Sequence, residues 1–401
     1  MKTREKIVDE ILDRGIITSI IPDRESFRER LLSAEPMKMY IGADPTSTSL
    51  HLSHAKNFML LEEFRLLGHE VILLFGDFTA RIGDPSDRMS ARKQLTGEEV
   101  RENVKEWSKQ IKPLMDFEAK VNPPRIVFNA DWLSKLTMED VVNLASQVTV
   151  QHMLERDMFV RRMKEEKPIH LHEFMYPLMQ GYDSVALEVD VELCGTDQTF
   201  NALVGRTLLN KLKGKEKFVV TVNLMENPKT GELMSKSKGT GVFLNTTPFD
   251  MFGGVMKQSD EMTEILLINN TRVSLDEIEK ILKSENPRDA KMRAAFEVTK
   301  IFHGEDEAKK AKEKFIELVQ KKNVVEDLPE VKVKEKNMTL FDLSKECLGD
   351  KVSNSEINRL IDQGAVKVDG EVWADRGAEV KIPKEGVTLK VGKKQWFRVI
   401  L

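Results

Sequence analysis

The chain has 401 residues, a length that predicts two or three domains. Its 62 basic and 66 acidic side chains leave a formal net charge of −4, which excludes a histone-like polycation and a disordered acidic chain but allows a local basic patch. No apolar run approaches the roughly 20 residues that a membrane span requires. The two cysteines, Cys194 and Cys347, exclude a disulfide scaffold and a four-cysteine zinc site. We therefore expect a cytoplasmic protein that has no contact with membranes.

The first part of the chain alternates strand-like and helix-like segments. In chain order we expect a strand over 38–42, a helix over 51–67 closed by Gly68, a strand over 70–75, a helix over 98–117, a strand over 125–129, a helix over 138–162 and a strand over 217–224. Strand, helix and strand form a βαβ unit, and apolar residues on both faces of 70–75 indicate a buried parallel strand. The sequence therefore predicts an α/β fold, a Rossmann-like doubly wound parallel sheet over 1–245 with a helical insertion at about 98–165.

The remainder of the chain predicts two further domains and a linker. Residues 246–330 carry helix-start signals, such as the capping box Ser274–Glu277, and few strand signals, so we expect a small helical domain. A charged, Pro-containing stretch predicts a linker over 331–336, and residues 337–401 predict a compact α+β module. The expected elements of the module are helices over 340–348 and 353–363 and a β-hairpin over 364–372 that turns at Asp369-Gly370.

The loop from Gly42 to Ala55 leaves a predicted strand and opens a helix, which is where doubly wound folds bind nucleotides. The start of a helix attracts phosphate through its unpaired N–H groups and the positive end of its dipole. His51 and His54 are three residues apart, so both side chains lie on one face of the first turn. We interpret them as donors to a phosphate. A metal pair or ordinary polar residues remain alternatives, although the zinc-protease spacing with an intervening Glu is missing.

A second candidate loop is the segment Leu233–Gly239, which follows the turn-rich stretch 227–231. Its small residues and lysines can fold over a polyphosphate. A solvated charged loop is the alternative interpretation, and it is the commoner explanation for such a sequence taken alone.

Together the two loops resemble the signatures of class I aminoacyl-tRNA synthetases, in their order and on a βαβ frame. The HIGH-like motif comprises Pro45, Thr46, Ser47, Thr48, Ser49, Leu50, His51, Leu52, Ser53 and His54. The KMSKS-like motif comprises Leu233, Met234, Ser235, Lys236 and Ser237. Ser53 stands where the family usually has Gly, and Leu233 stands where it often has Lys. Neither departure removes a required charge.

Two further stretches resemble the tyrosine pocket of tyrosyl-tRNA synthetases. Residues 76–86 are similar to the substrate loop of the tyrosyl and tryptophanyl subgroup, and Tyr176, Gln180 and Asp183 share one face of a predicted helix. By this resemblance the tyrosine-binding residues are Tyr40, Thr79, Asp84, Tyr176, Gln180, Asp183 and Gln198. A core helix with polar ends remains the alternative for that helix face.

The resemblance also implies how these residues divide the substrate between them. Tyr176, Gln180 and Asp84 hold the ammonium group, with Thr79 nearby. Tyr40 and Asp183 bind the phenolic hydroxyl. Phenylalanine would leave those two buried groups unpaired, at a cost of about 1–3 kcal/mol each. Tryptophan needs more room and an acceptor for its N–H, so we favour tyrosine.

The resemblance further implies an ATP site. Its expected residues are Gly42, Asp44, His51, His54, Gly195, Asp197, Leu224, Met225, Lys236 and Ser237. The residues expected to stabilise the growing phosphate charge are His51, His54, Thr46 and Lys236. Arg88 and Arg92 are candidates for pyrophosphate contacts or for a plain surface role, and Cys194 is expected to be a wall residue rather than a nucleophile.

The activity implied is tyrosine activation with ATP to tyrosyl-adenylate and pyrophosphate, followed by transfer to the 3'-terminal adenosine of tRNA(Tyr). We expect Mg²⁺ to accompany ATP, no tightly bound cofactor, no metal held by the protein and, from the resemblance, a homodimer. The alternatives are the tryptophan enzyme of the same class and a non-catalytic RNA-binding protein on a degenerate synthetase scaffold.

The last part of the chain resembles the alpha-L RNA-binding motif of a small-subunit ribosomal protein, a likeness carried by residues 353–370. The candidate RNA contacts are Arg359, Lys367, Lys393, Lys394 and Arg398. Cations interleaved with aromatic residues at 393–398 are typical of RNA contacts. A hydrophobic terminal strand with solvated lysines is the alternative.

Overall fold

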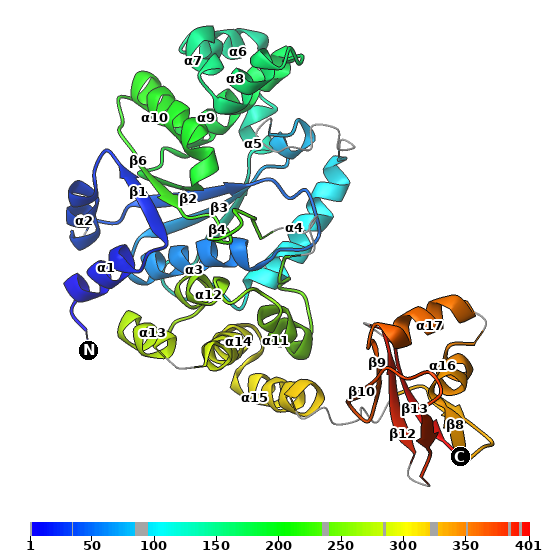
Figure 1. The fold of residues 1–401 in the computed structure, drawn as a ribbon. Coiled ribbons are helices and arrows are strands. Elements are labelled where there is room, and N and C mark those ends of the chain that lie inside the picture. Colours follow the sequence, from blue (N-terminus) through cyan, green and yellow to red (C-terminus); the bar gives the residue numbers. More distant parts are fainter. Residues whose placement is uncertain are drawn as a thin grey trace. The chain divides into compact units, whose positions relative to one another are not determined.

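The structure is a computed structural model that describes residues 2–33, 35–84, 95–234, 240–283, 286–320, 328–349, 352–383, 386–392 and 395–401. It divides into two compact units, residues 1–312 and 313–401 (Figure 1). Within the described residues, none of the helices is both long enough and apolar enough to cross a membrane. The predicted boundary at 245/246 falls inside the first unit, so the helical domain expected over 246–330 is not a separate compact unit.

The first unit is built on a six-stranded sheet with the order β1-β6-β5-β2-β3-β4. The strands are β1 (Ile17–Ile21), β2 (Lys38–Ala43), β3 (Glu70–Phe75), β4 (Arg125–Phe128), β5 (Val191–Gly195) and β6 (Phe218–Val222). The edge strand β1 is antiparallel to β6, and the remaining pairs are parallel. The predicted α/β fold with a parallel sheet is therefore confirmed.

Helices lie on both sides of this sheet, and in Figure 1 α3 runs below it while α9 and α10 lie above it. The helices up to residue 213 are α1 (Arg4–Asp13), α2 (Arg24–Leu32), α3 (Leu52–Leu66), η1 (Thr79–Arg81), α4 (Gly97–Ile111), α5 (Ala130–Leu133), α6 (Met138–Ala145), α7 (Val150–Leu154), α8 (Asp157–Lys164), η2 (Leu171–Phe174), α9 (Met175–Leu187), η3 (Thr196–Gln198) and α10 (Thr199–Lys213). Gly68 follows α3 with φ +98°, as the predicted helix end requires.

The helix predicted over 138–162 is instead three short helices, α6, α7 and α8. Two threonines explain the interruption, because each is the N-cap of a new helix. Oγ1 of Thr137 accepts from the N–H of Asp140, and Oγ1 of Thr149 accepts from the N–H of His152, both at 3.2 Å. Local capping therefore overrides a continuous helical pattern.

Five α-helices lie between residues 246 and 315 among the described residues, and the last of them crosses the end of the first unit at residue 312. They are α11 (Pro248–Met256), α12 (Met262–Asn270), α13 (Leu275–Leu282), α14 (Pro287–His303) and α15 (Glu305–Phe315). Arg14 donates to the carbonyl groups of Ile268 at 2.8 Å and Thr271 at 2.6 Å, at the end of α12. Asn270 donates to the carbonyl of Leu52 at 2.8 Å, at the start of α3. These polar contacts join α12 to α1 and α3 within the first unit.

The second unit contains the predicted α+β module, but it begins at residue 313 instead of the predicted residue 337. Its elements are the π-helical turn Ile316–Gln320, β7 (Glu330–Lys332), β8 (Asn337–Thr339), α16 (Leu340–Leu348), α17 (Asn354–Asp362), β9 (Val366–Val368), β10 (Glu371–Trp373), β11 (Glu379–Lys381), β12 (Val387–Val391) and β13 (Gln395–Ile400). The predicted hairpin is confirmed: β9 pairs with β10, and Asp369 and Gly370 both have positive φ. The predicted linker over 331–336 is wrong, because β7 pairs in parallel with β13 and Val333 is buried in the module core.

Candidate functional site

The two histidines of the predicted phosphate site lie side by side at the start of α3. His51 is the N-cap of the helix, and its backbone N–H donates to Nδ1 of His54 at 3.3 Å. The centroids of the two rings are 4.1 Å apart. The buried Nδ1 atom of His51 has no hydrogen-bond partner among the described residues. Two imidazoles and the positive end of a helix dipole therefore face one small volume, an arrangement that suits a phosphate.

Burial keeps both imidazoles neutral. It lowers the pKa of His51 to about 4 and that of His54 to about 3, and the neighbouring ring of His51 lowers the pKa of His54 further. At neutral pH each ring therefore carries one N–H donor and no charge. Phe243 lies 6.4 Å from His51 and Trp107 lies 6.2 Å from His54, measured between ring centroids, so aromatic rings border the pair.

The described residues on either side of 235–239 connect the histidine pair to the second loop. Phe243 forms an isolated antiparallel bridge with His51. On the other side, the N–H of Met234 donates to the carbonyl of Met225 at 2.8 Å. Of the described flanking residues, Phe243 is therefore held beside a histidine and Met234 beside Met225, a residue of the predicted ATP site.

Several predicted functional residues lie outside the described residues. They are Arg88, Arg92, Ser235, Lys236, Ser237, Lys393 and Lys394. Within the residues that the structure does describe, no three or more His, Cys, Asp or Glu side chains are grouped so that they could hold a metal ion.

Asp44 accepts hydrogen bonds from two distant parts of the chain. Its Oδ1 accepts from the hydroxyl of Thr79 at 2.6 Å, and its Oδ2 accepts from the hydroxyl of Tyr176 at 2.8 Å. Burial raises the pKa of Asp44 to about 7, although the two hydroxyl donors lower it. The sequence grouped Asp44 with the ATP site, whereas the structure joins it directly to two residues of the predicted tyrosine site. Its carboxyl group changes charge near neutral pH.

Asp183 lies on the same helix as Tyr176 and is held by two residues that the sequence analysis missed. Its Oδ1 accepts from Nε1 of Trp132 at 2.7 Å, and its Oδ2 accepts from Nδ2 of Asn129 at 3.3 Å. Asn129 also donates to the hydroxyl of Thr79 at 3.0 Å, so hydrogen bonds connect Asp183 to the Asp44 cluster. Burial raises the pKa of Asp183, and the two donors lower it. Their position in the sequence could have identified them, because Asn129 ends the predicted strand over 125–129 and Trp132 follows it closely. The carboxyl ends of the parallel strands are where the other site residues lie.

Asp84 and Gln180, both predicted to hold the ammonium group, belong to one set of hydrogen bonds. Nε2 of Gln198 donates to Asp84 at 2.7 Å. Asn201 donates to the side-chain oxygens of Gln198 and Gln180, each at 2.9 Å. Nη2 of Arg156 lies 3.7 Å from Oδ1 of Asp84. The structure therefore brings these residues together, and it adds Asn201 and Arg156 to the predicted set.

Gly195 and Asp197 of the predicted ATP site lie at the end of β5 and just after it. A Cβ on Gly195 would lie 2.4 Å from Oδ1 of Asp197, so only glycine leaves room for that side chain. Met225, another residue of the predicted ATP site, is buried. Lys56 of α3, which the sequence analysis missed, is also buried and donates to Asn57 at 2.9 Å. Burial lowers the pKa of Lys56 to about 7, and the charge of Asp197 raises it.

The predicted RNA contacts of the second unit differ in their surroundings. The guanidinium of Arg359 pairs with Glu356 at 2.6 Å. Lys367 of β9 lies opposite Lys390 of β12 in the antiparallel register, and Arg398 lies on the neighbouring strand β13. Two lysines opposite each other repel, which an anionic partner would relieve.

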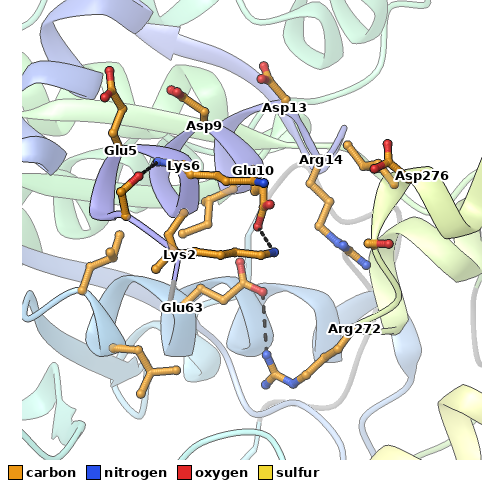
Figure 2. A pocket seen from close by; sticks show the side chains of 17 residues that line it. Lys2, Glu5, Lys6, Asp9, Glu10, Asp13, Arg14, Glu63, Arg272 and Asp276 are labelled. Atoms are coloured by element: carbon orange, nitrogen blue, oxygen red, sulfur yellow. Dashed lines mark hydrogen bonds and ion pairs between the residues drawn. The ribbon is translucent and has the colours of Figure 1, made fainter.

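A cavity of about 810 Å³ lies between α1, α3 and the connection from α12 to α13. Figure 2 shows the side chains that line it. Lys2 pairs with Glu10 at 2.6 Å, and Arg272 lies 3.7 Å from Glu63 on its wall. The cavity borders the end of α3 opposite to His51, so it plays no part in the chemistry of the histidine pair.

Comparison with known proteins gives the class. The sequence model of the family "tRNA synthetases class I (W and Y)" matches residues 32–320. The chain is 42% identical over 397 residues to the tyrosine–tRNA ligase of Thermotoga maritima, which covers 97% of this chain and 96% of the relative. It is 40% identical over 403 residues to the tyrosine–tRNA ligase of Carboxydothermus hydrogenoformans, which covers 98% of this chain and 97% of the relative.

Solved structures support the same fold. A C-terminally truncated mitochondrial tyrosyl-tRNA synthetase of Aspergillus nidulans superposes with a TM-score of 0.66 at 24% identity, covering 78% of this chain and 94% of that chain. The tyrosyl-tRNA synthetase of Archaeoglobus fulgidus complexed with L-tyrosine gives a TM-score of 0.59 at 20% identity, covering 76% and 99%.

The fold, the paired histidines and the family match define a class I tRNA synthetase of the tryptophan and tyrosine group. Within that group the chain belongs to the tyrosyl-tRNA synthetases, the ligases that activate tyrosine with ATP and attach it to tRNA(Tyr).

Proposed function

We propose that the cluster around Asp44 and Asp183 binds tyrosine and that the histidine pair binds the ATP phosphates, so that the tyrosine carboxylate meets the α-phosphorus between them. The observation that carries this proposal is the location of both groups at one edge of the sheet. Asp44 follows the carboxyl end of β2 and precedes His51 in the same loop. In doubly wound sheets this edge is where substrates bind.

The ammonium group of tyrosine is held by Tyr176, Gln180 and Asp84, with Asp44 and Thr79 behind Tyr176. The hydrogen bonds among these side chains support this assignment, because they fix the acceptors before the substrate arrives. The phenol is bound by Asp183 and Tyr40, and Gln198 lies toward the carboxylate.

The first chemical step needs no general base, because the tyrosine carboxylate is ionised at neutral pH. Catalysis then consists of positioning and of stabilising the charge that grows on the phosphates. His51 and His54 act as neutral N–H donors, together with Thr46 and Lys236. Each well-placed donor contributes about 2.7–4 kcal/mol to transition-state stabilisation, by analogy with oxyanion-hole donors.

The nucleotide is held by residues from three segments of the sheet edge. Gly42 and the histidine loop face the phosphates, Asp197 accepts from a ribose hydroxyl, and Leu224 and Met225 flank the adenine. Mg²⁺ enters with ATP as a largely hydrated, substrate-bound ion. No step requires a tightly bound cofactor.

We also propose a homodimer that associates through the helical insertion. Large apolar side chains are exposed in the insertion and just after it: Met138 at 78%, Val142 at 59% and Val150 at 65% within it, and Leu171 at 76% in the following turn η2. Exposed apolar surface of this kind marks a protein interface. Sedimentation should show a dimer that Leu171→Asp weakens, and an unchanged monomer for both proteins would refute the proposal.

Transfer to tRNA(Tyr) requires contacts beyond the catalytic site. We assign the anticodon to the helices of 246–312 and further RNA contacts to the second unit, through Arg359, Lys367, Lys393, Lys394 and Arg398. The facing lysines at 367 and 390 support the second assignment. A cytoplasmic location stays a prediction from the sequence.

Amino-acid-dependent exchange of pyrophosphate into ATP tests the proposal. Tyrosine should stimulate the exchange strongly, with little effect of tryptophan or phenylalanine. The variants His54→Ala and Asp183→Asn should each lower it, the first mainly through kcat and the second mainly through the KM for tyrosine. Tryptophan-stimulated exchange, or no exchange with any amino acid, would contradict the assignment.

A further inference from the structure

A fully buried ion pair lies behind the proposed tyrosine pocket, and no step described above uses it. Lys217 precedes β6 and Glu192 lies in the neighbouring strand β5, and their side chains are 0% and 2% exposed. Nζ of Lys217 donates both to Glu192 and, at 2.6 Å, to the hydroxyl of Ser184. A buried ion pair contributes little stability compared with apolar residues of the same size. Its position therefore calls for another explanation.

The carboxylate of Glu192 is connected to both ends of the pocket. Its Oε1 accepts from Nε2 of Gln180 at 3.1 Å, at the proposed ammonium end. Its Oε2 accepts from the hydroxyl of Ser184 at 3.2 Å. The oxygen of Ser184 lies 2.9 Å from the hydroxyl of Tyr40, at the proposed phenol end. Tyr40 of β2 is also the register partner of Glu192 in the sheet.

The chemistry of these groups fixes the direction of the hydrogen bonds made by Lys217. An ammonium group only donates and a carboxylate only accepts, so Lys217 donates to both Ser184 and Glu192. Ser184 has a single hydroxyl hydrogen, and either oxygen can be the donor in its bond with Tyr40. In both arrangements Lys217 and Glu192 hold Ser184, and Ser184 in turn holds the hydroxyl of Tyr40.

The hydroxyl of Tyr40 is therefore fixed in position before the substrate arrives. Burial, followed by the charges of Glu192 and Asp183, raises the pKa of Tyr40, so the phenol keeps its hydrogen at neutral pH. A substrate tyrosine offers this hydroxyl a hydrogen-bonding partner, and phenylalanine offers none.

We propose that Lys217 and Glu192, acting through Ser184, are positioning residues that hold the hydroxyl of Tyr40 beside the substrate phenol and thereby select tyrosine over phenylalanine. The inference rests on the proposed function, since it takes the substrate phenol to lie beside Tyr40 and Asp183. What the inference adds to that function is the role of the buried ion pair.

Gly205 of α10 leaves room for the ammonium group of Lys217. A Cβ at this position would lie 2.8 Å from Nζ of Lys217 and 3.0 Å from Oγ of Ser184. Glycine therefore leaves the space in which Lys217 reaches Ser184. The same Nζ lies 5.9 Å from the centroid of the Tyr40 ring, so the cation faces the side chain that it orients.

The test uses the full chain with two kinds of variant. The double variant Lys217→Met with Glu192→Gln removes both charges together, which avoids an unpaired buried charge and preserves folding. Ser184→Ala removes the hydrogen-bond partner of Tyr40. In pyrophosphate exchange, each should lower the ratio of kcat/KM for tyrosine over phenylalanine about tenfold, the effect of one lost buried hydrogen bond. The KM for ATP should stay unchanged.

Ser344→Ala is the matched control, because this buried serine of the second unit donates at 2.7 Å to the carbonyl of Leu340, far along the chain from the pocket. A merely structural loss lowers the active fraction and so affects both amino acids equally, which leaves the ratio unchanged. A wild-type ratio in the double variant and in folded Ser184→Ala would overturn the role of the pair, while tyrosine-dependent exchange by the wild type would leave the proposed function standing. An absence of that exchange in the wild type would instead refute the proposed function itself.

Discussion

Trp132 donates its indole N–H to Oδ1 of Asp183 across 2.7 Å, from a short helix that follows the edge strand β4. Asn129 donates to the other carboxylate oxygen. Both contacts are with neutral donors, and each carboxylate oxygen has a second lone pair. Asp183 is thus fixed in orientation and still able to accept from a substrate hydroxyl.

Replacing Trp132 by Phe should weaken tyrosine recognition. The change removes one N–H donor from a buried carboxylate, at a cost of about 1–3 kcal/mol. We expect a higher KM for tyrosine and a lower preference over phenylalanine in the exchange reaction. Trp373→Phe, in the second unit, is the control and should leave both quantities unchanged. Wild-type selectivity in Trp132→Phe would show that Asp183 does not sense the phenol.

Tyrosine binding should release a proton near pH 7. The pKa of Asp44 is raised to about 7 in the free protein, so part of the population is protonated there. A substrate ammonium next to Tyr176 favours the charged carboxylate and lowers that pKa, which releases the proton. Calorimetry of tyrosine binding in two buffers of different ionisation enthalpy measures the release. Asp44→Asn should abolish it, and buffer-independent heats for the wild type would contradict the location of the ammonium group.

Lys236→Ala should slow adenylate formation far more than it weakens tyrosine binding. The reason is that a loop cation acts on phosphate charge that grows in the transition state, whereas the amino acid is held elsewhere. Pre-steady-state measurement of adenylate formation separates the two effects. Lys257→Ala removes an exposed lysine that has no proposed role and should behave as the wild type. An unchanged rate in Lys236→Ala would remove the role assigned to the loop.

Removal of residues 321–401 should spare adenylate formation and weaken tRNA charging. The cut belongs before β7 because this strand pairs with β13 and would be left unpaired by a cut at 337. The first unit, with its own core, should stay folded and active in pyrophosphate exchange. Lys367→Ala in the full chain should weaken charging in the same direction. Charging kinetics that match the wild type in the truncated chain would refute the RNA role of the second unit.

The sequence predicted strands that match β2, β3, β4 and β6, and the apolar run of β3 indicated a buried parallel strand. It missed β5, whose run is interrupted by Glu192, and the half-exposed edge strand β1. In both cases tertiary pairing, which no local pattern records, makes the strand.

The candidate site also contains residues that the sequence identified and residues that it missed. The family motifs identified Asp44, Tyr176 and Asp183, since a motif preserves spacing along the chain. The side chains that orient them, such as Trp132 and Lys217, come from other segments and meet the site only in the folded chain. Tryptophan and lysine also occur elsewhere in the chain, so the residue type alone does not mark these two positions. Their hydrogen bonds in the folded structure do.

A crystal structure of the protein with a non-hydrolysable tyrosyl-adenylate is the most direct test of the account. It should show the phenol at Asp183 and Tyr40, the ammonium group at Tyr176 and Asp84, and the phosphate within hydrogen-bond distance of His51 and His54. An adenylate bound with its phosphate away from both imidazoles, or with its phenol outside the Asp183 pocket, would contradict the account.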